Sequence, residues 1–316
     1  MEIVLDEYEK NVYNKKDVLG ERKMDMKHFS KHKITFILSM AIFGTIGLFV
    51  KSIAVSSGEL SLYRALLAMV LIGGVMIFKK ERIDLRAIKK QLPFLLLSGA
   101  AMGFNWILLF EAFKLTTVSV ATLSYYFAPV IVMVVSPLIF KEKMGARQWV
   151  CFAMSTLGIV LITGIGDLSS GSNHFLGIAF ALMAAALYAS VMLLNKGIKG
   201  VEGIQRTFFQ FVAAIVVLIP YVALTGGVSL GGLNSIGWAC LLTVGLIHTG
   251  ITYCLYFSSM KELPGQEVAI LSYVDPLVAV LVSVLILQEP ITWMQGLGGA
   301  LILGFTLYNE LAPKKK

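Results

Sequence analysis

Charged residues are scarce in this sequence: Asp, Glu, Lys and Arg make up 15% of its 316 residues, whereas hydrophobic residues make up 57%. A soluble domain of this size needs more polar side chains to cover its surface. The charges also cluster in short runs between apolar stretches of about 20 residues, the length of helix that crosses a bilayer. The composition therefore excludes an ordinary soluble protein and predicts a protein with several transmembrane helices.

Cysteines and enzyme motifs are scarce as well. Cys151, Cys240 and Cys254 all fall within apolar stretches, so we expect buried, unpaired thiols. No HExxH, CxxC, Walker A or GxSxG motif occurs. Gly164-Ile-Gly-Asp167 resembles the GxGD motif of intramembrane aspartyl proteases, but the chain has no Tyr-Asp dipeptide to supply the second aspartate. We therefore expect no enzyme, no metal, no cofactor and no direct drive by ATP.

The apolar stretches predict an all-α membrane protein with ten transmembrane helices. Short loops join these stretches, so neighbouring helices are expected to run antiparallel. Residues 1–33 mix acidic and basic side chains with little apolar content, which predicts a flexible cytoplasmic tail. The ten predicted spans are 34–55, 58–78, 93–112, 118–140, 149–165, 175–194, 204–224, 236–257, 267–287 and 293–310.

A repeat of about half the chain length divides these spans five and five. Val120-Ala-Thr-Leu-Ser-Tyr125 recurs 148 residues later as Val268-Ala-Ile-Leu-Ser-Tyr273. A duplicated unit with an odd number of spans enters the membrane in two opposite orientations, and such repeats most often build transporters. We predict two inverted five-helix repeats, 34–165 and 175–310, followed by a basic cytoplasmic C-terminus at 311–316. The repeat also relates, at a spacing of 147 residues, Pro129 with Pro276, Ser136 with Ser283 and Glu142 with Glu289.

The placement of Lys and Arg predicts the orientation. These residues concentrate in the N-terminal tail, in loops 79–92 and 141–148, in segment 195–206 and at the C-terminus, whereas loops 166–174, 226–235 and 288–292 have none. Both termini are therefore expected in the cytoplasm, with the chain in the inner or plasma membrane. The net charge of +8 follows from this asymmetry. We therefore expect membrane lipid as a partner and do not need nucleic acid to explain the charge.

Two prolines lie inside long apolar spans. Pro129 and Pro276 each remove one backbone hydrogen bond and free carbonyl groups within the membrane. Tyr125 and Tyr126 precede the first proline, and Tyr273 precedes the second. Two interpretations remain open: kinked segments that line a substrate site with tyrosine walls, or structural kinks whose tyrosines pack against neighbouring helices.

Among the charged residues within the predicted spans, Arg64 and Asp275 lie farthest from the ends of their spans. A carboxylate such as Asp275 costs about 2.5–3.5 kcal/mol on insertion scales and normally faces a cavity or a partner. Asp275 can bind a cationic group, exchange a proton, or cap backbone amides beside Pro276. Arg64 can grip a substrate carboxylate through two hydrogen bonds, extend to the lipid headgroups, or pair with Glu59.

Further polar candidates lie in the third and eighth spans. Asn105 and Trp106 are mid-span and can line a cavity. His248 is the histidine deep in a span, where it can relay protons or bond to a backbone carbonyl. Glu142 and Glu289 lie beside loops, and we expect each to cap the following helix or to hold a turn.

Together these features resemble the drug/metabolite transporter superfamily, and within it the ten-helix EamA-type transporters. The resemblance implies inner-membrane carriers of amino acids, sugars, nucleobase-like compounds or amphipathic drugs, often exporters, that work by alternating access around a central cavity. It implies no shared set of substrate residues. The motifs that carry it are Arg64-Ala-Leu-Leu-Ala68, Ser119-Val-Ala121 with Ala128-Pro129, Lys141-Glu-Lys143, Asp275-Pro276 and Glu289-Pro290.

The sequence thus predicts a secondary transporter that exports small metabolites, amino-acid-like or otherwise amphipathic, with protons or another ion as the coupling partner. A channel-like facilitator with no coupling ion remains an alternative. A membrane sensor or assembly factor would need a larger domain outside the membrane than the loops provide. The oligomeric state stays open.

Overall fold

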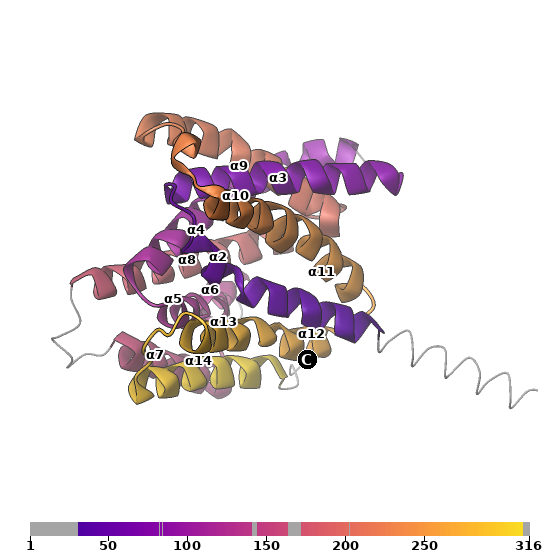
Figure 1. The fold of residues 1–316 in the computed structure, drawn as a ribbon. Coiled ribbons are helices and arrows are strands. Elements are labelled where there is room, and N and C mark those ends of the chain that lie inside the picture. Colours follow the sequence, from indigo (N-terminus) through magenta and orange to yellow (C-terminus); the bar gives the residue numbers. More distant parts are fainter. Residues whose placement is uncertain are drawn as a thin grey trace, which may run out of the picture.

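The structure is a computed structural model that describes residues 31–81, 83, 85–140, 144–163, 172–201 and 203–311. All regular secondary structure in this part of the chain is helical, which confirms the predicted all-α class. Figure 1 shows most of the helices running roughly the same way across the view. Glu142, the linker between the halves and most of the N-terminal tail lie outside the described residues.

The described residues form ten helical segments, five in each half of the chain. In the first half these are Lys31–Val50, which ends in α2 (Ile46–Val50), then α3 (Ser57–Phe78), α4 (Leu85–Leu115), α5 (Val118–Tyr125) with α6 (Ala128–Phe140), and α7 (Ala146–Thr163). In the second half they are α8 (Ser172–Gly197), α9 (Gly203–Thr225), α10 (Ser235–Leu242) with η2 (Thr243–Ile251) and α11 (Thr252–Met260), α12 (Gly265–Ser272) with α13 (Val274–Leu285), and α14 (Trp293–Leu311).

Eight of these segments are long and apolar enough to cross a membrane. The other two are the interrupted pair α12 and α13, which contains the apolar run Ile270–Leu285, and α14, which carries Gln295 and Glu310. Five segments in each half agree with the predicted repeat.

The helix α4 begins eight residues before the predicted start of its span at 93. Its first turns expose Lys89, but Ile88 is buried and packs against Ile198 and Val201 beyond the end of α8. Hydropathy marks only the apolar part of a helix, and tertiary packing extends this one into polar sequence.

The two ends of the helix bundle are named by residues. The terminal end is where the segment Lys31–Val50 begins and α14 finishes. The Glu289 end is where α13 finishes and α14 begins. In Figure 1 the C-terminus and the start of the first segment lie at the right, at the terminal end.

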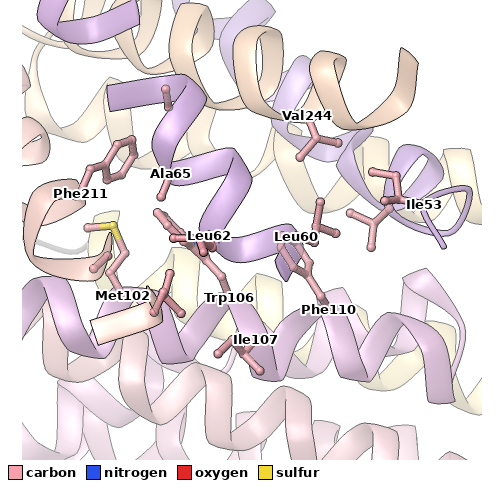
Figure 2. Packing of buried hydrophobic residues seen from close by; sticks show 14 of the residues in the cluster. Ile53, Leu60, Leu62, Ala65, Met102, Trp106, Ile107, Phe110, Phe211 and Val244 are labelled. Atoms are coloured by element: carbon pink, nitrogen blue, oxygen red, sulfur yellow. The ribbon is translucent and has the colours of Figure 1, made fainter. Parts of the chain in front are cut away.

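The largest buried cluster lies between α3, α4, α9 and η2. Figure 2 shows Leu62 and Ala65 of α3 close to Trp106 of α4, with Phe211 of α9 beside them. Small residues allow such close approach: a Cβ atom on Gly245 of η2 would collide with Leu67 of α3. Close van der Waals packing of this kind is a main attraction between helices inside a bilayer.

The interrupted helices converge at one end of the bundle. At the Glu289 end, α5 and α13 pack against each other. At the terminal end, α6 packs against α8 and α12 packs against α14, while α6 and α12 make little or no mutual contact among the described residues. The fourth and ninth segments therefore approach at the Glu289 end and diverge at the terminal end.

Candidate functional site

Both interrupted helices expose backbone groups inside the bundle. The helix α5 ends at Tyr125 and α6 begins at Ala128, just before Pro129. The helix α12 ends at Ser272 and α13 begins two residues before Pro276. Proline has no N–H, so the carbonyl four residues earlier, Tyr125 or Ser272, loses its helical donor. Each break thus offers a hydrogen-bond acceptor to other groups.

One hydrogen bond joins the two breaks across the halves of the molecule. The hydroxyl of Tyr126 donates to Asp275 Oδ2 at 2.7 Å. The same hydroxyl oxygen lies 3.5 Å from the carbonyl oxygen of Ser272, the group that Pro276 leaves without a helical donor. Asp275 forms no ion pair with any cation in the described part of the chain.

Arg64 lies in an aromatic pocket of side chains and is only 4% exposed. Its Nε donates to Thr249 Oγ1 at 3.0 Å. The guanidinium carbon lies 4.5 Å from the ring centroid of Trp106 and 5.3 Å from that of Phe110. Such cation–π contacts contribute about 0.5–2 kcal/mol each. They hold the guanidinium plane without neutralising its charge.

Neither structural alternative for Arg64 is seen. Its burial excludes extension to the headgroups, and none of the ion pairs among the described residues includes it. The carboxylate of Glu59 instead accepts the backbone N–H of Ser229 at 2.5 Å and the hydroxyl of Ser229 at 2.7 Å. Glu59 therefore ties the start of α3 to the loop after α9.

A π-helix, η2, presents the acceptor for Arg64. The hydroxyl of Thr249 accepts from Arg64 and donates to the carbonyl of Val244, five residues earlier, at 2.8 Å. π-Helices are rare and occur frequently at functional sites. The wider turn lets one threonine hydroxyl serve both partners.

His248 lies in the same π-helix but is tied to the first helical segment. Its Nε2 is 2.9 Å from Thr45 Oγ1, and its Nδ1 is 3.3 Å from the carbonyl oxygen of Thr243. The ring of Phe49 contacts the imidazole edge to face at 4.8 Å. The contact of Nδ1 with a carbonyl oxygen is the one that the carbonyl-bonded interpretation expects, and the proton relay stays an open prediction.

Asn105 and the tyrosines connect α4 to the first break. Asn105 Nδ2 donates to the carbonyl of Ala184 at 2.6 Å, and its Oδ1 accepts from the hydroxyl of Tyr125 at 3.4 Å. The ring of Tyr125 stacks on that of Tyr188 at 5.4 Å. On the other side, the rings of Tyr126 and Tyr273 are 6.4 Å apart. The predicted tyrosines thus gather around the breaks.

Aromatic rings, among them Tyr253 of α11, continue from Arg64 toward the first helical segment. Trp106, which packs on Arg64, also packs on Phe211 at 5.3 Å. The ring of Tyr253 packs against Phe211 at 5.5 Å and Phe43 at 5.2 Å. Phe43 precedes Gly44, where a Cβ atom would come within 2.5 Å of the carbonyl oxygen of Asp275. We therefore take Arg64, Asp275 and these rings together as the candidate site.

The sequence analysis did not identify the following residues of this site: Phe110, Tyr188, Phe211, Thr249 and Tyr253. Nothing in the sequence marks Tyr253 or Thr249, because their roles arise from the π-helix and from contacts between distant segments.

The site offers one cation, one anion and several aromatic faces. Among the described residues, no group of three His, Cys, Asp or Glu side chains could hold a metal ion. The arrangement suits the binding of an organic molecule with separate charged and apolar parts. Its opposite charges lie inside a bundle of membrane-crossing length, as expected of a site that a solute reaches from water.

The helical fold and the repeated halves define a multi-pass membrane protein, and comparison with known families gives its class. The EamA-like transporter family model matches the chain twice, over residues 31–164 and 175–309. The chain belongs to this family and is a membrane transporter.

Its relatives carry transporter names as well. The uncharacterized transporter YxxF of Bacillus subtilis (strain 168) is 32% identical over 262 residues, covering 81% of this chain and 82% of that protein. Human solute carrier family 35 member G1 is 25% identical over 279 residues, covering 84% of this chain and 74% of that protein. A solved crystal structure shares the fold with a TM-score of 0.61 at 16% identity, covering 88% of this chain and 96% of that one.

Proposed function

We propose that this chain is a secondary carrier that exports small amino-acid-like metabolites by alternating access. The observation that carries the proposal is the pair Arg64 and Asp275, two opposite charges inside the bundle with no ion-pair partner among the described residues. A charge removed from water is costly unless it is paired. A zwitterion supplies both partners, with its carboxylate at Arg64 and its ammonium group at Asp275.

The aromatic residues support an apolar side chain on the substrate. Trp106 and Phe110 flank the guanidinium of Arg64, and Tyr126 donates to Asp275. Tyrosine and tryptophan faces bind apolar groups and also attract an ammonium group. These surfaces favour an amino acid or a similar amphipathic compound as the substrate.

The direction of transport follows from orientation. We place the terminal end in the cytoplasm, since the loops at that end carry most of the Lys and Arg residues. The divergence of α6 and α12 supports access from the cytoplasm, and the packing of α5 on α13 supports closure on the other side. Export then starts from this conformation and proceeds by rocking of helices from the two halves around a midplane cavity.

Asp275 is also our candidate for the coupling proton. Its carboxylate attracts an ammonium group only when it is ionised, so substrate and proton compete for one group. A carrier with such competition releases the substrate outside as a proton binds and takes up substrate inside as the proton leaves. An inward proton gradient would then drive export.

The test is ligand-dependent thermal stabilisation of the purified protein. We expect amino acids to raise the melting temperature by mass action, whereas the matching decarboxylated amines and deaminated acids do not. Arg64→Lys keeps the charge but loses the planar fork, and should weaken amino-acid affinity by about tenfold or more. Equal stabilisation by amines or acids alone, or an unchanged affinity in Arg64→Lys, would contradict the proposal.

Two controls accompany this test. Glu111→Gln removes a carboxylate that pairs with Lys114 on the same helix at 3.3 Å, and amino-acid affinity should not change. Counterflow in proteoliposomes separates the carrier from the facilitator. A carrier accelerates entry of labelled substrate when unlabelled substrate is present on the opposite side, and an uncoupled facilitator does not.

A further inference from the structure

A cluster of polar groups at the Glu289 end joins three of the helical segments. Glu289 Oε2 accepts the backbone N–H of Val118 at 2.7 Å and the hydroxyl of Ser283 at 2.5 Å. Glu289 Oε1 accepts from Lys51 Nζ. The hydroxyl oxygen of Ser283 in turn accepts the backbone N–H of Ser119 at 3.2 Å. We call these five residues the Glu289 clamp.

The clamp corrects one of the two expectations for Glu289, that it caps the helix that follows it. The bond of Glu289 to Ser283 agrees with the other, that it holds a turn. The helix α14 has its own cap, because Thr292 and Gln295 exchange two side chain-to-backbone hydrogen bonds of 2.9 and 3.2 Å. Glu289 caps α5 instead, which belongs to the other half of the chain. The first N–H groups of a helix lack intrahelical partners and favour a negative charge. The contact therefore stabilises the closed approach of the two halves.

Close packing lies directly beneath the clamp. A Cβ atom on Gly47 would come within 2.5 Å of Val118 Cγ1, and one on Gly44 within 2.5 Å of the carbonyl oxygen of Asp275. The first helical segment is thus pressed against the start of α5 and against α13. The clamp lies at the end of this contact, between the exterior of the bundle and Asp275.

We propose that the Glu289 clamp is the gate that holds this end of the transporter closed. The inference rests on the proposed alternating access, because the substrate must leave the site through the Glu289 end of the bundle. Access requires α5 and α13 to separate, which breaks the bonds of Glu289 to Val118 and Lys51. The side chain of Glu289 is 11% exposed and that of Lys51 is 30% exposed, so water is close enough to replace the broken bonds.

The repeat supplies related groups at the terminal end. Ser136 aligns with Ser283 at a spacing of 147 residues, and Lys196 aligns with Lys51 at 145. Lys196 Nζ donates to Ser136 Oγ at 3.3 Å. Inverted repeats put equivalent residues at opposite ends of the bundle. In this conformation the clamp is assembled at the end where α5 and α13 converge, as a gate requires.

The experiment measures access to a buried reporter without any substrate. Ala279 of α13 is 3% exposed and packs in the cluster that contains Val118. Val228 lies exposed in the loop between α9 and α10, at the Glu289 end, so Val228→Cys marks that side of the membrane. Ala279→Cys is placed in a cysteine-free background, and a membrane-impermeant maleimide is applied to the side on which Val228→Cys reacts. We expect Glu289→Gln to raise the labelling rate of Ala279→Cys by about tenfold, because charge-assisted hydrogen bonds become neutral ones. Lys51→Met should act in the same direction.

Two controls separate gating from loosening of the fold. Glu111→Gln removes a carboxylate at the same end whose partner, Lys114, is on its own helix, so labelling of Ala279→Cys should not change. A chain that keeps only Cys151, which is fully buried, should stay unlabelled until it is denatured.

The proposal is overturned if Ala279→Cys labelling is unchanged in both clamp variants. It is also overturned if Glu111→Gln produces the same increase, or if Cys151 becomes reactive together with Ala279→Cys in Glu289→Gln. Because no substrate is present, failure of the gate leaves the amino-acid test of Arg64 unaffected, and the two proposals fail separately.

Discussion

At the scale of single residues, Arg64 and Asp275 are held by different means. Arginine has five N–H donors, and Thr249 is the hydrogen-bond acceptor that the structure gives it. Asp275 accepts one hydroxyl, from Tyr126. Aromatic faces and hydroxyl groups position both charges without neutralising them. Each side chain therefore keeps hydrogen-bonding capacity that a ligand can use.

The first prediction at this scale concerns Asp275→Asn. If the carboxylate exchanges the coupling proton, the amide variant should lose the dependence of transport on pH, because asparagine does not titrate. The measurement is the initial rate of substrate counterflow and of proton-driven export in proteoliposomes between pH 6 and pH 8. Tyr126→Phe is the matched control, since it removes the hydrogen bond but keeps the carboxylate, and its transport should remain pH-dependent. Unchanged pH dependence in Asp275→Asn would remove this residue from the coupling role.

At the scale of elements, the interruptions of the helices place the residues of the candidate site. The breaks beside Pro129 and Pro276 bring Tyr126 to Asp275, and the π-helix brings Thr249 to Arg64. The uninterrupted helices supply close contacts instead. The backbones of α7 and α14 cross at Gly158 and Gly298, where a Cβ atom on either glycine would come within 2.6 Å of the other's carbonyl oxygen.

This crossing yields a prediction for stability. Gly298→Ala should lower the stability of the folded state by about 1–3 kcal/mol, because the new methyl group meets the backbone of α7 and cannot be accommodated by a rotamer change. Gly296→Ala lies two residues away on α14, where a Cβ atom meets nothing within 4 Å. That control should be neutral or slightly stabilising, as alanine favours helix more than glycine. Thermal unfolding in detergent compares the two, and equal midpoints would contradict the packing argument.

At the scale of the whole molecule, the two halves meet through the site and through the clamp. Tyr126 of the first half bonds to Asp275 of the second, and Val118 bonds to Glu289. Both bonds join the fourth and ninth helical segments, one midway along them and one at the Glu289 end. Movement of the fourth segment against the ninth therefore changes the site and the clamp together.

The orientation of the whole chain is testable with single cysteines. Val228 is 68% exposed in the loop between α9 and α10, and Lys261 is exposed after α11. With the terminal end in the cytoplasm, an impermeant maleimide should label Val228→Cys in intact cells and Lys261→Cys only after permeabilisation. The reverse pattern would place the termini outside and turn the proposed export into uptake.

Much of the architecture could be predicted from the sequence because membrane insertion acts on local properties. Apolar length predicts spans, and the 147-residue repeat predicts five helices in each half with interruptions near Pro129 and Pro276. The rarity of charge inside spans singled out Arg64 and Asp275. These inferences rest on one physical rule: exposing polar groups to hydrocarbon costs free energy. Each segment must satisfy that rule on its own, so its own sequence shows how it does so.

Only the tertiary structure decided which groups are partners. Tyr126 meets Asp275 149 residues away, Arg64 meets Thr249 185 residues away, and Glu289 caps α5 rather than the helix after it. Such pairs depend on the relative rotation and approach of helices, which small residues and a π-turn set over the whole bundle. Local sequence patterns determine what each helix buries, whereas packing between distant helices determines what each buried group binds.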